Sequence, residues 1–216
     1  MPHPSLIRAG TLLVCAAVWS ADAGGTMAAD EAAGNGTQAS LGTIGDFALQ
    51  DLDGRTLTRQ HLAGKRAVVL LFLGTECPVS NGYAPIMTEL ANRCAKQGVL
   101  VEGVHSDPTV TRQSAREHAK EYALTFPMLL DPEQLLARQA GVTVTPEAVV
   151  LAADGKIAYR GRIDNRYSPE GKRRLEATSH DLDLALAAVL AGHRPAAATT
   201  PSFGCPLPKR RPAASQ

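Results

Sequence analysis

The chain has 216 residues, of which 44% are hydrophobic and 20% are charged, and its formal net charge is +1. This length supports one ordinary globular core with tails and excludes two large domains. A charge so close to neutral provides no field that would gather nucleic acid or an anionic membrane, so we expect neither as a partner.

The first 23 residues have the pattern of an export signal. Arg8 precedes an apolar stretch, residues 9–19, which is too short to span a bilayer, and the small-residue sequence Ala21-Asp22-Ala23 follows it. A buried N-terminal helix is the alternative. The glycine-rich stretch after this segment favours export, so we expect a signal peptide at 1–23, a flexible lead-in at 24–40 and a periplasmic or secreted protein without stable membrane insertion.

The first half of the remaining chain predicts strands that alternate with a helix. A short strand at 45–49 precedes the Asp53-Gly54 turn, and the continuous apolar run 67–73 has the length of a central strand covered on both faces. Apolar residues at steps of three and four then predict an amphipathic helix from about 78 to 97, followed by a strand at 100–105.

The second half predicts further capped helices and a hairpin. Asp107-Pro108 is expected to open a helix that runs through residue 122, and Asp131-Pro132 a helix that ends near residue 141. Thr178 and Asp181 form a predicted capping box for a last helix from about residue 179. The remaining predicted strands are 128–130, 148–151 and 156–159, the last two joined by an Asp-Gly turn.

These elements predict an α/β fold with a mixed central sheet and helices on both faces. We expect one domain at 41–194. Residues 195–216 are rich in Pro and Ala and carry Cys205 on a tail, either ordered or flexible, that is not a domain of its own.

Cys77 stands where the predicted central strand ends and a helix begins. Free backbone N–H groups and the positive end of the helix dipole stabilise a thiolate at such a position, and Pro78 fits the first helical position. The plainer alternative is a cysteine that fills a gap at the end of the strand. The position favours a reactive thiol.

The stretch Val69 to Ser80, VLLFLGTECPVS, resembles the active-site strand and helix start of thioredoxin-like redoxins, of the exported thiol-disulfide reductase and peroxiredoxin-related (AhpC/TSA) kind. The resemblance covers roughly residues 41 to 192. It implies a thioredoxin-like fold, a cis peptide bond between Thr145 and Pro146 that faces the cysteine, and an exposed Thr145 backbone that can bind an extended substrate chain.

The sequence departs from both branches of that family. Dithiol redoxins carry a second cysteine where this chain has Ser80, and a hydroxyl cannot attack a mixed disulfide at neutral pH. Peroxiredoxins carry a proline and a threonine where this chain has Leu70 and Gly74. Thr75 and Glu76, directly before Cys77, are the remaining polar candidates in this loop, and a carboxylate at Glu76 would raise the thiol pKa or accept a proton, depending on burial.

Two other cysteines of the exported chain are candidates for a partner of Cys77. Cys94 would lie about 25 Å from Cys77 along an unbroken helix, too far for a disulfide, so we expect it to be a buried apolar residue. Cys205 lies on a tail that can extend about 40 Å, which leaves three possibilities: a bridge to Cys77, an unpaired thiol or a link to a second molecule.

We therefore expect an exported thiol-dependent oxidoreductase that uses Cys77 as its nucleophile, with Cys205 as the candidate resolving thiol. Its expected partners are protein or small-molecule thiols, disulfides or peroxide, and an external thiol reductant. Thr75, Glu76, Thr145 and Pro146 complete the predicted site; Arg160, Arg162 and Arg166 are either thiolate-stabilising or, more simply, solvated. No cofactor or zinc motif is present. Two alternatives stay open: copper(I) handling by Cys77, Cys205 and His105, and a redox-inactive binding module.

Overall fold

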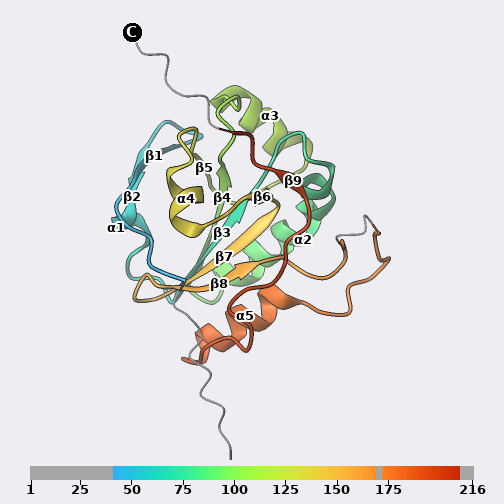
Figure 1. Ribbon diagram of the computed structural model, residues 1–216. Helices are drawn as coiled ribbons and strands as arrows, with labels where there is room; N and C mark the ends of the chain where they lie inside the picture. The colour runs from blue at the N-terminus through green and yellow to red at the C-terminus, as the bar shows by residue number, and fades with distance from the viewer. Residues whose placement is uncertain (1–40, 169–171, 210–216) are drawn as a thin grey trace, which may run out of the picture. The chain divides into compact units, whose positions relative to one another are not determined.

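A computed structural model describes residues 41–168 and 172–209 (Figure 1). The predicted signal peptide and lead-in lie outside the described residues. Within the described ranges, no helix has both the length and the apolar character needed to cross a bilayer.

A seven-stranded mixed sheet forms the centre of the fold. Its order is β2-β1-β5-β4-β3-β7-β8, in which β3, β4 and β5 run parallel and the other pairs are antiparallel. The strands are β1 (Ala48–Asp51), β2 (Thr56–Thr58), β3 (Ala67–Phe72), β4 (Val99–His105), β5 (Met128–Leu130), β7 (Glu147–Ala152) and β8 (Ile157–Gly161). A separate antiparallel pair joins β6 (Val144–Thr145) to β9 (Cys205–Pro206).

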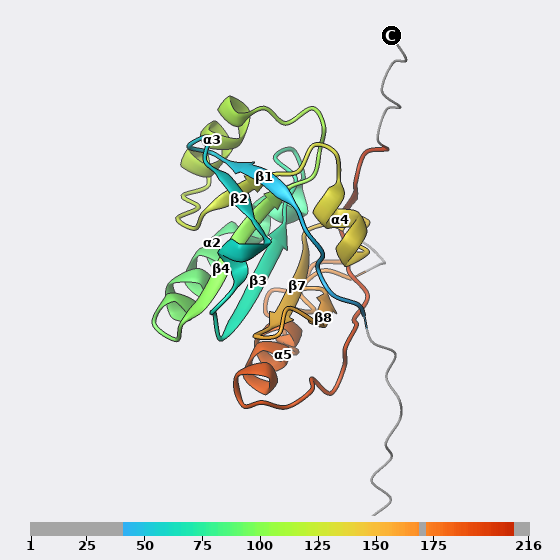
Figure 2. The same cartoon turned by 90° about the vertical axis from the view of Figure 1, so that its left-hand side faces the viewer.

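Strand β3 is buried along its whole length because both faces of the sheet are covered. Val69 and Leu71 face a core that contains α2 (Pro78–Ala95) and α5 (Asp181–Leu190), and residues of α3 (Arg112–Glu121) and the loop after it pack at its edge. Val68 and Leu70 face a second core with α1 (Arg59–Leu62) and α4 (Leu135–Ala140). Figure 2 shows α2 and α4 on opposite sides of the sheet, which confirms the predicted fold class.

Two helices begin later than the sequence predicted. Helix α3 begins at Arg112, where Thr111 and Ser114 form a reciprocal capping box. The Asp107 carboxylate instead accepts hydrogen bonds from the N–H and hydroxyl of Thr109, which closes a local turn. Helix α4 begins at Leu135, although Asp131 still caps it by accepting from the N–H groups of its first turn.

The predicted capping box of the last helix is wrong. Helix α5 begins at Asp181, and no side chain caps it through its N-cap residue, His180. The Thr178 hydroxyl accepts a hydrogen bond from Asn165, and Asp181 forms an ion pair with Arg162. Both side chains therefore join a tertiary network instead of the local motif.

The described part of the tail is ordered against the domain, which is one of the two possibilities that the sequence left open. Ala198 and Thr200 form backbone hydrogen bonds with Arg160 of β8, and the Thr200 hydroxyl lies 2.6 Å from the hydroxyl oxygen of Tyr159. The segment then continues to β9. Backbone hydrogen bonds thus hold the tail in place, although its Ala- and Pro-rich sequence shows no strand or helix pattern.

Residue His105, at the end of β4, is expected to make the fold acid-sensitive. Its side chain is buried, and burial together with the nearby His118 lowers its pKa to about 4. An unfolded histidine titrates near 6.5, so the unfolded chain binds the proton first, and about 3 kcal/mol of stability should be lost as the pH falls from 6.5 to 4. Urea unfolding of the wild type and of His105→Gln across this window measures the effect; equal losses in both proteins would contradict it.

Candidate functional site

Cys77 occupies the N-cap of α2, directly beyond β3. Its Sγ accepts a hydrogen bond from the backbone N–H of Ser80 at 3.5 Å, and Pro78 takes the first helical position. In the thiol form, Cys77 donates to the carbonyl oxygen of Thr145 at 3.1 Å. The residue is only 3% exposed, so direct contact with solvent is small.

The surroundings of Cys77 lower the pKa of its thiol. Burial acts in the opposite direction and raises the pKa, but hydrogen bonds from the thiol and N–H of Cys205 and from the N–H and hydroxyl of Ser80 to the sulfur outweigh it. The helix N-terminus adds a favourable field for negative charge. Cys77 is therefore the thiol of this site that ionises first.

Cys205 approaches Cys77 from the tail. Strand β9 pairs with β6 so that Cys205 stands opposite Thr145, the residue whose carbonyl accepts from Cys77. Burial and the neighbouring Cys77 raise the pKa of Cys205 to about 11. Both cysteines are free thiols here. The two sulfurs thus form an asymmetric pair, with one acidic member and one that stays protonated.

The peptide bond between Thr145 and Pro146 is cis, which confirms the expectation from the family resemblance. Thr145 is buried, and its backbone is paired with the chain's own tail. At Gly204, directly before Cys205, a Cβ atom would overlap the carbonyl oxygen of Thr145, so only glycine permits this close approach.

The loop before Cys77 is held by residues that the sequence did not single out. The Thr75 carbonyl accepts from Asn81 Nδ2 at 3.1 Å, and Asn81 Oδ1 lies 2.8 Å from Nε2 of His118 on α3. Glu76 is exposed whereas Cys77 is buried, so the two side chains occupy different environments. No sequence motif links Asn81 to His118, because their contact depends on how α3 packs.

Ser80 is buried and its Oγ accepts from the N–H of Gly74 at 3.2 Å. The hydroxyl that replaces the second cysteine of dithiol redoxins therefore helps to fix the loop between β3 and α2.

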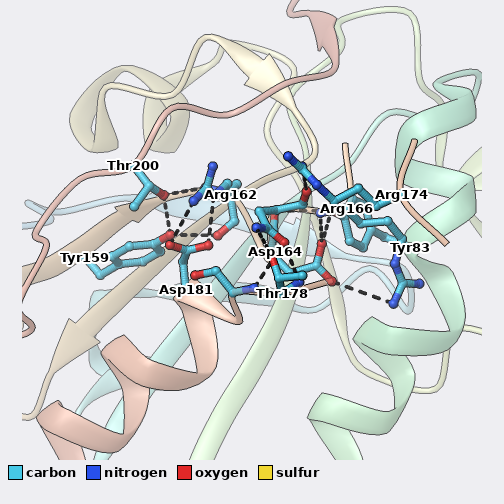
Figure 3. Close-up of polar contacts among 11 residues, drawn as sticks. Tyr83, Tyr159, Arg162, Asp164, Arg166, Arg174, Thr178, Asp181 and Thr200 are labelled. Carbon is cyan, nitrogen blue, oxygen red and sulfur yellow. Dashed lines mark hydrogen bonds and ion pairs between the residues drawn. The ribbon is translucent and has the colours of Figure 1, made fainter. Parts of the chain in front are cut away.

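The three arginines nominated from the sequence are partly exposed, and each of them lies close to a carboxylate. Arg162 forms a two-point ion pair with Asp181, and Arg166 lies 3.9 Å from Asp164 (Figure 3). Asp164 also accepts from the hydroxyl of Tyr83 on α2. Arg160 contacts the buried Glu147 at 3.9 Å. These ion pairs and the hydrogen bond from Tyr83 connect α2, β7, α5 and the segment that includes and follows β8, and they have a structural role.

Cys94 and His105 do not join the cysteine pair. Cys94 is 2% exposed within the core, and burial raises its pKa to about 11, as expected for an apolar role. Across the described ranges, no group of three or more His, Cys, Asp and Glu side chains is arranged to hold a metal ion. The alternative in which Cys77, Cys205 and His105 converge as copper ligands is therefore not supported by the described residues.

Comparison with known proteins places these observations in a family. The model of the AhpC/TSA family matches residues 42–160. Curated relatives include the thiol-disulfide oxidoreductase ResA of Geobacillus thermodenitrificans (strain NG80-2), 32% identical over 53% of this chain and 64% of that protein, and ResA of Bacillus anthracis, 30% identical over 52% and 63%. The matches thus span less than two thirds of the relatives' length.

Solved structures agree on the fold. An uncharacterized conserved protein from Geobacillus kaustophilus has a TM-score of 0.70 and 26% identity, with 80% of this chain and 92% of that chain covered. A hypothetical protein from Sinorhizobium meliloti 1021 has a TM-score of 0.69 and 26% identity over 78% and 93%. The chain belongs to the AhpC/TSA family of the thioredoxin-like redoxin superfamily.

Proposed function

We propose that the protein is an exported thiol-disulfide oxidoreductase in which Cys77 is the nucleophile and Cys205 the resolving thiol. The observation that carries this proposal is the paired geometry of the two cysteines, in which hydrogen bonds from Cys205 help to lower the pKa of Cys77. The ResA relatives support the same class of reaction. Export is supported by the sequence of residues 1–23.

The reaction is a pair of thiol-disulfide exchanges. The Cys77 thiolate attacks one sulfur of a substrate disulfide, forms a mixed disulfide and releases one substrate thiolate. Cys205 then loses its proton and attacks Sγ of Cys77, which forms the Cys77–Cys205 bridge and releases the second substrate thiolate. Two electrons pass from the protein to the substrate, and an external dithiol returns the bridge to two thiols.

Disulfide exchange fits the site better than peroxide reduction. Leu70, at the spacing of the peroxiredoxin proline, is fully buried in the core on the α4 face of the sheet, and Gly74 brings no hydroxyl. The site therefore lacks the threonine that positions and polarises a peroxide in that family. The acidic thiol argues against a redox-inactive binding module.

The proposal is tested by turnover of hydroxyethyl disulfide with a dithiol reductant, measured as a function of pH. Because the pKa of Cys77 is lowered, the rate of the first exchange should rise as the thiolate forms and level off below the ordinary thiol pKa of about 8.5. Absence of turnover, or a rate that keeps rising beyond that value, would overturn it.

A further inference from the structure

The tail strand has the placement of a bound substrate chain. Residues 204–207 run antiparallel to residues 143–145, directly before the cis proline, and Figure 1 shows β9 beside β6. The N–H of Leu207 donates to the carbonyl of Thr143 at 2.9 Å. An extended chain is thus paired backbone to backbone beside Cys77, with its own cysteine in register with Thr145.

Contacts on both sides of β9 hold this strand in place. Before it, the Ser202 hydroxyl donates to Glu147 at 3.2 Å. After it, Leu207 packs against the core on the α4 face, and Gln134 donates to the carbonyl of Pro208 at 2.7 Å. The pairing is therefore anchored by side chains as well as by backbone hydrogen bonds.

Because the tail occupies the backbone edge of β6, a substrate chain cannot pair there at the same time. Backbone pairing of an extended polypeptide beside Thr145 would need the same N–H and carbonyl groups of β6 that the tail already uses. A tethered strand competes at a high effective concentration, whereas a free polypeptide loses translational and rotational entropy when it binds. A small disulfide needs no strand partner and reacts once its sulfur reaches Cys77.

We propose that residues 204–207 act as a tethered substrate mimic that keeps polypeptides off β6 and restricts the enzyme to low-molecular-weight disulfides. This inference rests on the proposed function, since it names the substrate class of the same two-cysteine site. The electron balance is that of the two exchanges above, with the small disulfide as the oxidant and two small thiols as its products.

The test compares a small and a polypeptide substrate in a chain whose tail strand is released. Leu207→Asp removes the apolar anchor without touching either cysteine, and Lys209→Gln makes the same one-unit change of charge at an exposed tail position. Both variants are made in a Cys205→Ser background, so that only the first exchange is measured in all three proteins.

We expect Leu207→Asp to raise the rate with insulin at least about tenfold relative to the rate with hydroxyethyl disulfide, and Lys209→Gln to leave this ratio unchanged. Amide hydrogen exchange at Leu207 in the background protein should be slow because that N–H is bonded to Thr143. Fast exchange there would overturn the inference.

A second variant covers the case in which Leu207→Asp leaves the strand paired. Gly204→Val introduces a Cβ that overlaps the Thr145 carbonyl and must displace the strand. If exchange shows that the strand is released and the substrate ratio stays at its original value, the inference is wrong. If none of the proteins reacts with either disulfide, the proposed function itself fails.

Discussion

In the Cys205→Ser variant, a mixed disulfide is expected to accumulate on Cys77. The first exchange needs only the Cys77 thiolate, which keeps its hydrogen bonds from Ser80. The second exchange needs a thiol beside it, and a serine hydroxyl cannot supply one at neutral pH. With an excess of a chromogenic disulfide and no reductant, the wild type should release two substrate thiols per chain and Cys205→Ser one. Cys77→Ser, which keeps the high-pKa thiol of Cys205, should release at most one, and slowly.

The substitution should change the rate at which the second substrate thiol is released even more than the number of thiols released. We expect the second release to slow by at least about 100-fold in Cys205→Ser, because no other described cysteine is within reach and Cys94 is sealed in the core. Release of two thiols by this variant at the wild-type rate would show that Cys205 does not resolve Cys77.

Adding Ser80→Cys to the Cys205→Ser variant is expected to restore the second release. The backbone N–H of Ser80 lies 3.5 Å from Sγ of Cys77, one helical turn along α2, and its side chain is buried next to the loop that carries Cys77. A thiol there faces the mixed disulfide from the helix, as in dithiol redoxins. The measurement is again the number of substrate thiols released per chain, with Ser80→Ala in the same background as the matched control.

The Ser80→Ala control distinguishes attack by a new thiol on the mixed disulfide from a change in the structure of the loop before Cys77. Both substitutions remove the hydroxyl that accepts from the N–H of Gly74, but only one introduces a thiol. We expect two thiols from the Ser80→Cys combination and one from the Ser80→Ala combination. One thiol from both would mean that position 80 cannot reach the mixed disulfide.

The central part of the fold was predictable because its signals are strong and local. A continuous apolar run defines β3, and apolar residues at helical spacing define α2. The starts of α3 and α4 were misplaced because Asp107 and Asp131 each precede a proline, and an aspartate followed by proline caps a helix or closes a turn equally well. Tertiary neighbours decide between these outcomes.

The candidate site likewise has one part that the sequence predicts and one part that it does not. The sequence identified Cys77 from its place between strand and helix, and the structure supports that placement. The position of Cys205 could not be predicted, because it depends on a two-residue strand that pairs with residues far away in the chain and has no periodicity of its own. The contact between Asn81 and His118 was missed for a similar reason.

The central claim is that Cys77 and Cys205 form one redox couple. It is tested most directly by oxidising the full chain with one equivalent of a small disulfide and mapping its cysteine-containing peptides by mass spectrometry without reductant. We predict a bridge between Cys77 and Cys205 within one chain, with Cys94 left as a thiol. A bridge between chains, a bridge to Cys94 or a stable adduct on Cys77 in the wild type would contradict the claim.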